Sequence, residues 1–318
     1  MHFLLIIIYG YILVAIIVIS ILWRDQEKLK GKKKIFAQTA IFVLFLGILM
    51  AISTTLLYPN LLIIKEKQIK INKIQEPITI IFVSDIQVGK HKKTLWVEKI
   101  VEKIESAKPD MVILGGDLIS NEGTFEDESK YLEPLVKLSE KYPTYAVMGN
   151  HEYGIGSKNR ENINRQTGDR SEDVIARLNK LNIPILRNQI DCPQIKEQKI
   201  CLFGIDDIWS KPINFDDLKK WEDRKFVPII FITHNPDGIT YWPEEDKPDL
   251  VLAGHTHGGQ IWVPGIGPFG LAGVELGKKY YRGLNYWNNI PIYTSVGAGE
   301  SAGPIRFWVI PEITKIKI

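Results

Sequence analysis

The residues best able to do chemistry are two histidines one position apart, His255 and His257, just after the apolar run Leu250–Ala253. At the end of a strand, the two imidazoles can each reach a different metal ion. Four further clusters of metal-ligand residue types precede them in order: Asp85-Ile86-Gln87, Gly116-Asp117, Gly149-Asn150-His151-Glu152 and Thr233-His234-Asn235. Several clusters follow short β-branched runs typical of buried strands, which predicts that the ligands gather at one edge of a sheet.

This mixture of ligands indicates a particular chemistry. Carboxylate, amide and imidazole groups together suit hard or borderline divalent ions, and an aspartate can bridge two ions through its two oxygens. Two metal ions about 4 Å apart can clamp the oxygens of a phosphorus centre during in-line attack. The sequence signals no Ser-His-Asp or Cys-His triad and no phosphate-binding Walker loop. The clusters therefore predict a hydrolase of phosphoesters with a dinuclear metal site.

The five clusters, in this order, resemble the calcineurin-like metallophosphoesterase superfamily, and in particular its bacterial membrane-associated branch. The match covers residues 78 to 310. It includes the continuation Gly258-Gly259-Gln260-Ile261 and the late segments Gly297-Ala298-Gly299 and Pro304-Ile305-Arg306-Phe307. The resemblance implies a four-layer α/β/β/α sandwich that hydrolyses phosphoesters with two divalent metal ions.

The resemblance also implies roles for single positions. One group of residues would hold the first metal: Asp85, Gln87, Asp117 and His257. A second group would hold the other: Asp117, Asn150, His234 and His255. Asp117 would bridge the two ions, and a hydroxide between them would be the nucleophile. His151 is similar to the family's catalytic histidine, which stabilises charge in the transition state and can protonate the leaving oxygen.

One position departs from the family's pattern, because Gln87 stands where most members have a histidine. This change exchanges a neutral nitrogen ligand for a neutral oxygen, which shifts the preference toward harder ions such as Mn²⁺ or Mg²⁺. Some relatives, including the manganese-dependent ADP-ribose/CDP-alcohol diphosphatases, also have glutamine here. We therefore predict two divalent ions, Mn²⁺ first, with Mg²⁺, Zn²⁺ or Fe as alternatives and weaker binding of the first metal.

The elements that position these residues follow an α/β pattern from residue 78 onward. Apolar runs predict strands at residues 78–84, 111–114, 144–147, 199–204, 226–233 and 250–253. Amphipathic periodicity predicts helices at residues 93–107, 127–141, 171–181 and 215–223. The alternation predicts one α/β domain whose later strands are partly antiparallel. The polar residues 154–169 are either a surface loop or a flap that shapes the substrate entrance.

The first fifth of the 318-residue chain has a different character. Residues 3–23 and 35–58 contain no charge, and each stretch is long enough to cross about 30 Å of hydrocarbon as a helix. A buried core helix and a cleaved signal are the alternatives, although the first three residues lack the basic start of a signal. We predict a transmembrane hairpin over residues 1–58 and a phosphoesterase domain over residues 78–318. Residues 59–77 form a connector, which is an edge strand or a membrane-surface segment.

The loop between the two apolar stretches predicts the orientation. Residues 24–34 hold six basic and two acidic side chains, and such loops stay in the cytoplasm. The chain is therefore predicted to be an integral protein of the bacterial cytoplasmic membrane, with its catalytic domain on the outer, periplasmic or extracellular, face. Four lysines within residues 65–73 oppose this orientation. Cys192 and Cys201 lie in a predicted hairpin, where a disulfide and a pair of free thiols both remain open.

The distribution of charge along the chain limits the classes of partner that it can bind. The formal net charge is +3, but residues 24–34 and 65–76 together contribute +6, so the rest of the chain carries −3. A slightly acidic catalytic domain argues against general binding of nucleic acid. The remaining partners are the bilayer and a phosphoester, mono- or diester, related to lipids or the cell envelope. Protein partners stay unknown.

Two other functions remain open. Some members of the branch that this sequence resembles hydrolyse the pyrophosphate of UDP-2,3-diacylglucosamine in lipid A synthesis, on the cytoplasmic side of the membrane. The other alternative is a non-catalytic, metal-dependent binding or sensory module, which only Gln87 motivates.

Several residues outside the clusters have more than one interpretation. Lys90, Lys92 and Lys93 open a predicted helix and either contact a substrate phosphate or form a solvated charged run. Arg306 is a structural or a phosphate-contacting residue, and Trp262 and Phe269 either line a pocket or pack.

Overall fold

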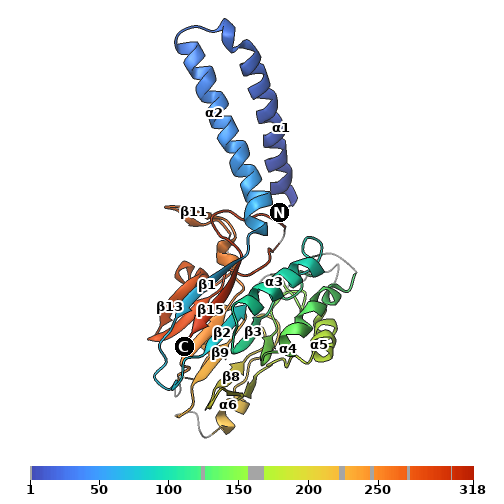
Figure 1. Ribbon diagram of the computed structural model, residues 1–318, viewed down its shortest axis with the longest axis vertical. Coiled ribbons are helices and arrows are strands. Elements are labelled where there is room, and N and C mark those ends of the chain that lie inside the picture. Colours follow the sequence, from blue (N-terminus) through green and yellow to red (C-terminus); the bar gives the residue numbers. More distant parts are fainter. Residues whose placement is uncertain are drawn as a thin grey trace.

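A computed structural model describes residues 2–122, 126–156, 168–221, 226–243, 247–270, 273–301 and 303–318. Two long helices, α1 (His2–Asp25) and α2 (Lys32–Ile52), lie side by side and project from an α/β domain (Figure 1). A 3-10 turn, Gln26–Lys28, lies between them. After α2 the chain continues through a π-helical turn, Ser53–Leu57, and a 3-10 turn, Tyr58–Asn60, into the domain.

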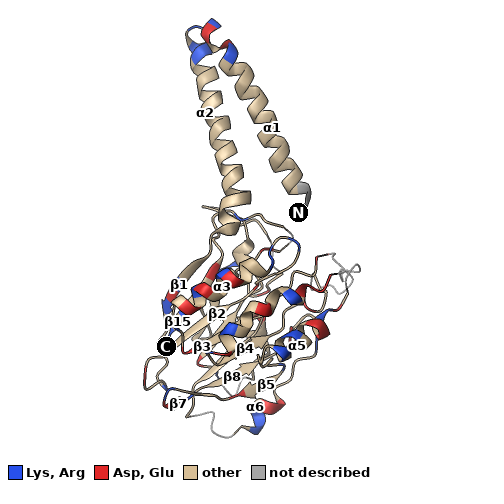
Figure 2. Ribbon diagram, turned by 45° about the vertical axis from the view of Figure 1, so that its right-hand side comes forward, with Lys and Arg blue, Asp and Glu red and all other residues tan. Residues whose placement is uncertain are grey.

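Both helices are long and apolar enough to cross a membrane, by length and composition. Charged residues are absent from most of their length and gather at the far end of the hairpin, where the two helices are joined (Figure 2). Large apolar side chains such as Leu13, Val14 and Phe42 are exposed along them. The described part of the chain does not cover this apolar surface.

The first sheet has five strands in the order β1-β15-β2-β3-β4. Their bounds are β1 (Ile63–Gln68), β15 (Glu312–Lys317), β2 (Thr79–Val83), β3 (Met111–Gly115) and β4 (Thr144–Val147). Strands β2, β3 and β4 are parallel, and β15 is antiparallel to β2. The connector therefore contains an edge strand, β1, which pairs in parallel with the last strand of the chain.

The second sheet has six strands in the order β13-β14-β10-β9-β8-β5. Their bounds are β13 (Gly283–Trp287), β14 (Ile290–Thr294), β10 (Leu250–Ala253), β9 (Ile229–Ile232), β8 (Cys201–Gly204) and β5 (Gln189–Asp191). The four central strands are parallel and the two outer ones antiparallel, as predicted for the later strands. Two small ribbons complete the strands: β6 (Gln194–Ile195) with β7 (Gln198–Lys199), and β11 (Trp262–Val263) with β12 (Gly267–Pro268).

Alternation along the strands divides the apolar core. In β2, Ile81 and Val83 pack with the helices α3 (Thr94–Ser106) and α5 (Ser171–Lys180), whereas Ile80 and Phe82 face the second sheet. A third cluster covers the outer face of the second sheet. The predicted α/β class is confirmed. The fourth layer stays a prediction, because α6 (Asp216–Lys220) is the one short α-helix that the described residues place on that outer face.

Two predicted helices differ from the observed ones. Residues 127–141 form a 3-10 helix, Glu128–Leu135, followed by the short α4, Val136–Ser139, because Pro134 has no N–H group and its ring disfavours α-helical hydrogen bonding. The helix predicted at 215–223 is only α6, after which Trp221 is extended. Residues 222–225 lie outside the described residues, as does most of the predicted loop or flap, at 157–167.

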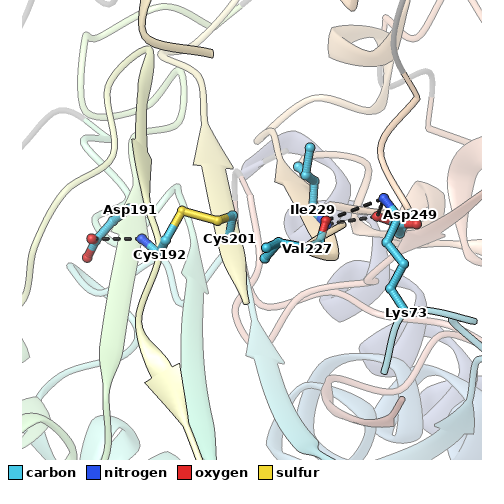
Figure 3. The surroundings of a disulfide bond; sticks show 7 residues. All are labelled: Lys73, Asp191, Cys192, Cys201, Val227, Ile229 and Asp249. Carbon is cyan, nitrogen blue, oxygen red and sulfur yellow. Dashed lines mark hydrogen bonds and ion pairs between the residues drawn. A yellow bond between two sulfur atoms is a disulfide. The ribbon is translucent and has the colours of Figure 1, made fainter. Parts of the chain in front are cut away.

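A disulfide joins Cys192 to Cys201 across the pair β5 and β8 (Figure 3). Asp191 pairs with Leu202 in this antiparallel register, so the next residues outward, the two cysteines, lie opposite each other. The sequence left a disulfide and free thiols open, and the structure has the disulfide. Cys201 is fully buried, which shields one of the two sulfurs.

We expect the disulfide to stabilise the domain by about 2–3 kcal/mol, because it restricts the unfolded chain over a short loop. Replacing both cysteines by alanine should lower the urea midpoint of the full chain in detergent. Dithiothreitol should lower the midpoint of the wild type by a similar amount and leave the double variant unchanged. An identical midpoint for the reduced and oxidised wild type would contradict the expectation.

Candidate metal centre

The predicted ligands follow the carboxyl ends of five strands. Asp85 comes after β2, Asp117 after β3 and Asn150 after β4, all in the first sheet. His234 follows β9, and His255 and His257 follow β10, in the second sheet. Because each set of strands is parallel, its carboxyl ends meet at one edge, where α/β sheets bind ligands.

The structure brings the ligand residues together in two groups that share one carboxylate. Ligand atoms of Asp117, His234 and His255 all lie within 4.8 Å of one another, and so do those of Asp85, Asp117 and His257. Every one of these residues is buried. Asp117 therefore lies between two separate sets of donors.

The two amide residues lie against these groups. Gln87 donates from Nε2 to Asp117 Oδ2 over 3.1 Å. Asn150 Oδ1 lies 2.9 Å from His255 Nδ1. All seven predicted ligands thus lie in one buried cluster.

Backbone carbonyls orient two of the histidines. His234 Nδ1 lies 2.8 Å from the carbonyl oxygen of Gly115, and His257 Nδ1 lies 3.2 Å from that of Gly299. With a proton on Nδ1, each ring directs the lone pair of Nε2 at a carboxylate, which lies 3.2 Å away at Asp117 and 3.4 Å away at Asp85. Metal-ligating histidines donate their other N–H group to a carbonyl or carboxylate in this way.

The donor set fits two divalent cations. Gln87 Oε1 is buried and has no hydrogen-bond partner, so an oxygen ligand is available beside Asp117. Burial and the nearby Asp117 raise the pKa of Asp85 to about 6, although His234 opposes them. The excess of buried negative charge therefore favours cation binding, and the mixture of carboxylate, amide and imidazole donors suits hard or borderline ions.

Two histidines keep the Asp117 carboxylate ionised. Burial tends to raise the pKa of Asp117, but His234 and His151 outweigh burial and hold it far below its usual range. Burial likewise tends to lower the pKa of His234, but Asp117, Asp85 and Asp207 raise it to about 10. A proton on His234 and a divalent cation compete for the same negative charge, so cation binding is expected to release a proton.

His151 lies at the margin of the cluster. Its backbone N–H donates to Asp117 Oδ1 over 2.9 Å, and its ring Nδ1 contacts the carbonyl oxygen of Ser120. The ring Nε2 lies 3.9 Å from Asp117 Oδ2, and 16% of the side chain is exposed. The ring is thus fixed at one nitrogen while the other lies near both the carboxylate and solvent, as a proton donor to substrate requires.

Comparison with known proteins now identifies the family. The sequence pattern of the family described as "Calcineurin-like phosphoesterase" matches residues 78–259. The chain belongs to the calcineurin-like phosphoesterase family. The chain is 34% identical over 262 residues to a Helicobacter pylori (strain ATCC 700392 / 26695) protein named "Uncharacterized metallophosphoesterase", covering 80% of this chain and 63% of that protein.

Two other relatives are similar over most of the domain. "Phosphodiesterase YaeI" of Escherichia coli (strain K12) is 30% identical over 246 residues, which are 76% of this chain and 82% of the relative. "Uncharacterized metallophosphoesterase YkuE" of Bacillus subtilis (strain 168) is 28% identical over 222 residues, which are 69% of this chain and 71% of the relative. The chain spans less than two thirds of the Helicobacter relative.

Five of the predicted ligand residues lie on strained backbone. Asp85, Gln87, Asp117, His255 and His257 all have positive φ angles, between 48° and 69°. Such conformations cost free energy in non-glycine residues and cluster at functional sites. The glycines of the motifs permit the close packing. A Cβ atom on Gly149 would lie 2.2 Å from Asp117 Oδ1, and one on Gly254 would lie 2.5 Å from Asp85 Oδ2.

Glu152 has a structural role, although the sequence indicates only its place in the Asn150-His151 cluster. Its buried carboxylate accepts hydrogen bonds from the backbone N–H groups of four residues, over 2.6 to 3.2 Å: Asp117, Leu118, Ile119 and Gly149. These bonds connect the turn after β3 to the turn after β4. Glu152 therefore fixes Asp117 relative to Asn150 and His151.

Sequence reasoning also missed two residues after β8. The Trp209 ring packs edge-on against His255, with ring centroids 4.5 Å apart. Asp207 is buried, and its charge is among those that raise the pKa of His234. The sequence does contain an indication of Asp207, because the pair Asp206-Asp207 follows an apolar strand in the same way as the predicted ligands do.

Two basic residues with open roles prove to be structural. Arg306 is fully buried and donates to the carbonyl oxygens of Val296, Gly297 and Gly299. Lys92 is buried as well, with its ammonium 2.6 Å from the carbonyl oxygen of Pro59 and 3.5 Å from Glu300. Lys90 and Lys93 are exposed.

We expect Asp117→Asn to remove most bound metal from both positions, because its carboxylate belongs to both donor groups. Gln87→Ala should remove only one equivalent, since its oxygen lies beside one group. Elemental analysis of the full chain after dialysis against Mn²⁺ measures both values. Asp249→Asn is the matched control, because this carboxylate pairs with Lys73 and precedes β10, at the opposite end of that strand from His255. Two retained equivalents in Asp117→Asn would refute the bridging role.

Proposed function

We propose that this chain is a membrane-anchored phosphodiesterase that requires two divalent metal ions. The observation that carries the proposal is the pair of buried donor groups sharing Asp117, with His151 at their margin. Such an arrangement suits a phosphorus centre, because two cations can contact its oxygens while a proton donor reaches the leaving group.

The seven ligand residues divide as the family resemblance implies. Asp85, Gln87, Asp117 and His257 would hold one ion, and Asp117, Asn150, His234 and His255 the other. When bound, the two ions supply Lewis-acid stabilisation of phosphoryl oxygens and make water a better nucleophile at neutral pH. The oxygen of Gln87 in place of an imidazole favours Mn²⁺ at the first position.

His151 would act directly on the substrate. The Ser120 carbonyl fixes one ring nitrogen, and the neighbouring Asp117 and Ser120 outweigh burial to raise the pKa of His151. A protonated imidazole at this place can stabilise negative charge on a phosphoryl oxygen and donate a proton to the leaving oxygen. The presence of His151 beside all the predicted ligands also argues against a non-catalytic binding module.

A diester is the favoured substrate class. The Escherichia coli relative is named a phosphodiesterase, and the chain covers 82% of it. Anchoring by α1 and α2 would keep the domain, residues 78–318 with the connector 59–77, among lipid-linked phosphoesters. We therefore infer a diester related to lipids or the envelope.

The outer face of the cytoplasmic membrane is the inferred location of the domain. Basic residues concentrate in the loop at the far end of the hairpin, and such loops remain in the cytoplasm (Figure 2). The disulfide gives independent support, because disulfides persist in oxidising compartments. Both observations disfavour hydrolysis of UDP-2,3-diacylglucosamine, which takes place in the cytoplasm.

The full chain in detergent with Mn²⁺ should hydrolyse bis-p-nitrophenyl phosphate and lose this activity on addition of a chelator. His151→Ala should lower kcat by about 10²- to 10⁴-fold, the usual contribution of a general acid. Its metal content and melting temperature should match the wild type, which separates loss of chemistry from loss of metal. Full metal occupancy without turnover of the diester, or of a panel of phosphomonoesters and pyrophosphates, would favour the binding module instead.

Cysteine labelling in intact cells tests the orientation. The native cysteines are joined, so a membrane-impermeant maleimide should react with an introduced Glu140→Cys in the domain. Lys30→Cys, in the loop between the helices, should react only after the membrane is permeabilised. The reversed pattern would place the domain in the cytoplasm and revive the UDP-2,3-diacylglucosamine alternative.

A further inference from the structure

An apolar ribbon projects from the domain beside the base of the helical hairpin. It consists of β11, β12 and the turn between them, and Figure 1 shows it level with the end of α2. Residues 258–274 contain no charged residue. Ile266 in the turn is 78% exposed, and Phe269 just after β12 is 75% exposed. These side chains would present a large apolar area to water.

An aromatic row continues this surface from the end of the helix. Tyr58 packs edge-on against Phe307, with ring centroids 6.2 Å apart, and Phe307 lies 6.1 Å from Trp308. The Trp308 side chain is 55% exposed although its backbone has φ of 61°, a conformation that a bulky residue rarely adopts. An exposed indole on strained backbone indicates a functional contact.

Backbone hydrogen bonds fix the ribbon to the end of the hairpin. The N–H of Arg306 donates to the carbonyl oxygen of Thr54 over 3.0 Å, and the N–H of Trp262 donates to that of Phe307 over 2.9 Å. Ile261 also pairs with Phe307. The neighbouring residues Arg306 and Phe307 thus connect the ribbon to the place where α2 ends.

We propose that this apolar finger, residues 262–269 together with Trp308, inserts into the interfacial layer of the bilayer from which the hairpin emerges. The inference rests on the proposed membrane anchoring by α1 and α2. If α2 spans the bilayer, the finger lies at the height of the lipid headgroups, where aromatic side chains are enriched and apolar side chains leave water.

A cation beside the finger fits the same partner. The Arg282 guanidinium lies 3.7 Å from the centroid of the Trp262 ring. An arginine over an indole combines an apolar body with a positive tip, and lipid phosphates lie at this depth. The described finger offers no acidic side chain that would repel those phosphates.

The finger is also adjacent to the metal centre along the chain. His257 begins the 3-10 turn His257–Gly259, and Gln260 then connects to β11 while its side chain donates to the carbonyl oxygen of Ser301. The membrane contact therefore begins a few residues after a candidate ligand. The substrate class this arrangement fits is an amphiphile whose phosphodiester stands at the bilayer surface.

Site-specific fluorescence tests the finger in the full chain. Three single variants, Ile266→Cys, Val14→Cys and Phe226→Cys, carry a nitrobenzoxadiazole label in vesicles of phosphatidylethanolamine and phosphatidylglycerol. Val14 is 58% exposed on α1 and reports on the anchor. Phe226 is 82% exposed and precedes β9, so it lies at the opposite end of that strand from His234 and is the water-exposed control.

The labels at positions 266 and 14 should be quenched by doxyl lipids and shifted to the blue, whereas the label at position 226 should be quenched by iodide. Lipid quenching at position 14 combined with iodide quenching at position 266 would overturn the finger and leave the anchor intact. Such a result would favour a protein partner for the apolar surface. Iodide quenching at position 14 would overturn the anchor, and the finger with it.

Discussion

The burial of two neighbouring carboxylates, Asp85 and Asp117, is the constraint on which the rest of the structure depends. Charge of this kind is costly to remove from water unless cations or hydrogen-bond donors compensate for it. The His234 ring and the backbone N–H of His151 compensate Asp117, whereas the pKa of Asp85 rises to about 6 because burial outweighs its partners. The buried negative charge that remains favours the binding of divalent cations, and the strained backbone of the predicted ligands persists because the surrounding sheets hold it.

Beside the apolar core between the two sheets, a hydrogen bond joins them directly. Tyr293, on β14 of the second sheet, donates its hydroxyl to Glu312, on β15 of the first. The buried Arg306 guanidinium holds the loop after β14 through the carbonyls of Val296, Gly297 and Gly299. Gly299 in turn donates to the carbonyl of Asp85 and accepts from His257. A buried side chain outside the predicted ligand set thus positions one predicted ligand from each sheet.

The parts of this arrangement that depend on local pattern were predictable from the sequence. The runs before Asp85, Asp117 and His255 have the length and composition of buried strands, and α3 and α5 formed near their predicted limits because their apolar positions repeat at helical spacing. Pro134 was visible in the sequence, yet periodicity alone predicted an α-helix there. The pairing of β1 with β15, the register that joins the cysteines and the contact of Trp209 with His255 depend on tertiary structure, which no local pattern reports.

Hydrogen bonds connect the end of the helical hairpin to the loop beside the candidate metal centre. Thr54, near the end of the second apolar helix, accepts the backbone N–H of Arg306, and Pro59 accepts the ammonium of Lys92. Lys92 and Arg306 both pair with Glu300, which directly follows Gly299. Removing one partner of a buried ion pair is strongly destabilising, so this network holds the end of the hairpin against the loop that contains Glu300. If the hairpin spans a bilayer, these contacts hold the candidate metal centre in a fixed orientation to the membrane, which a flexible tether would not do.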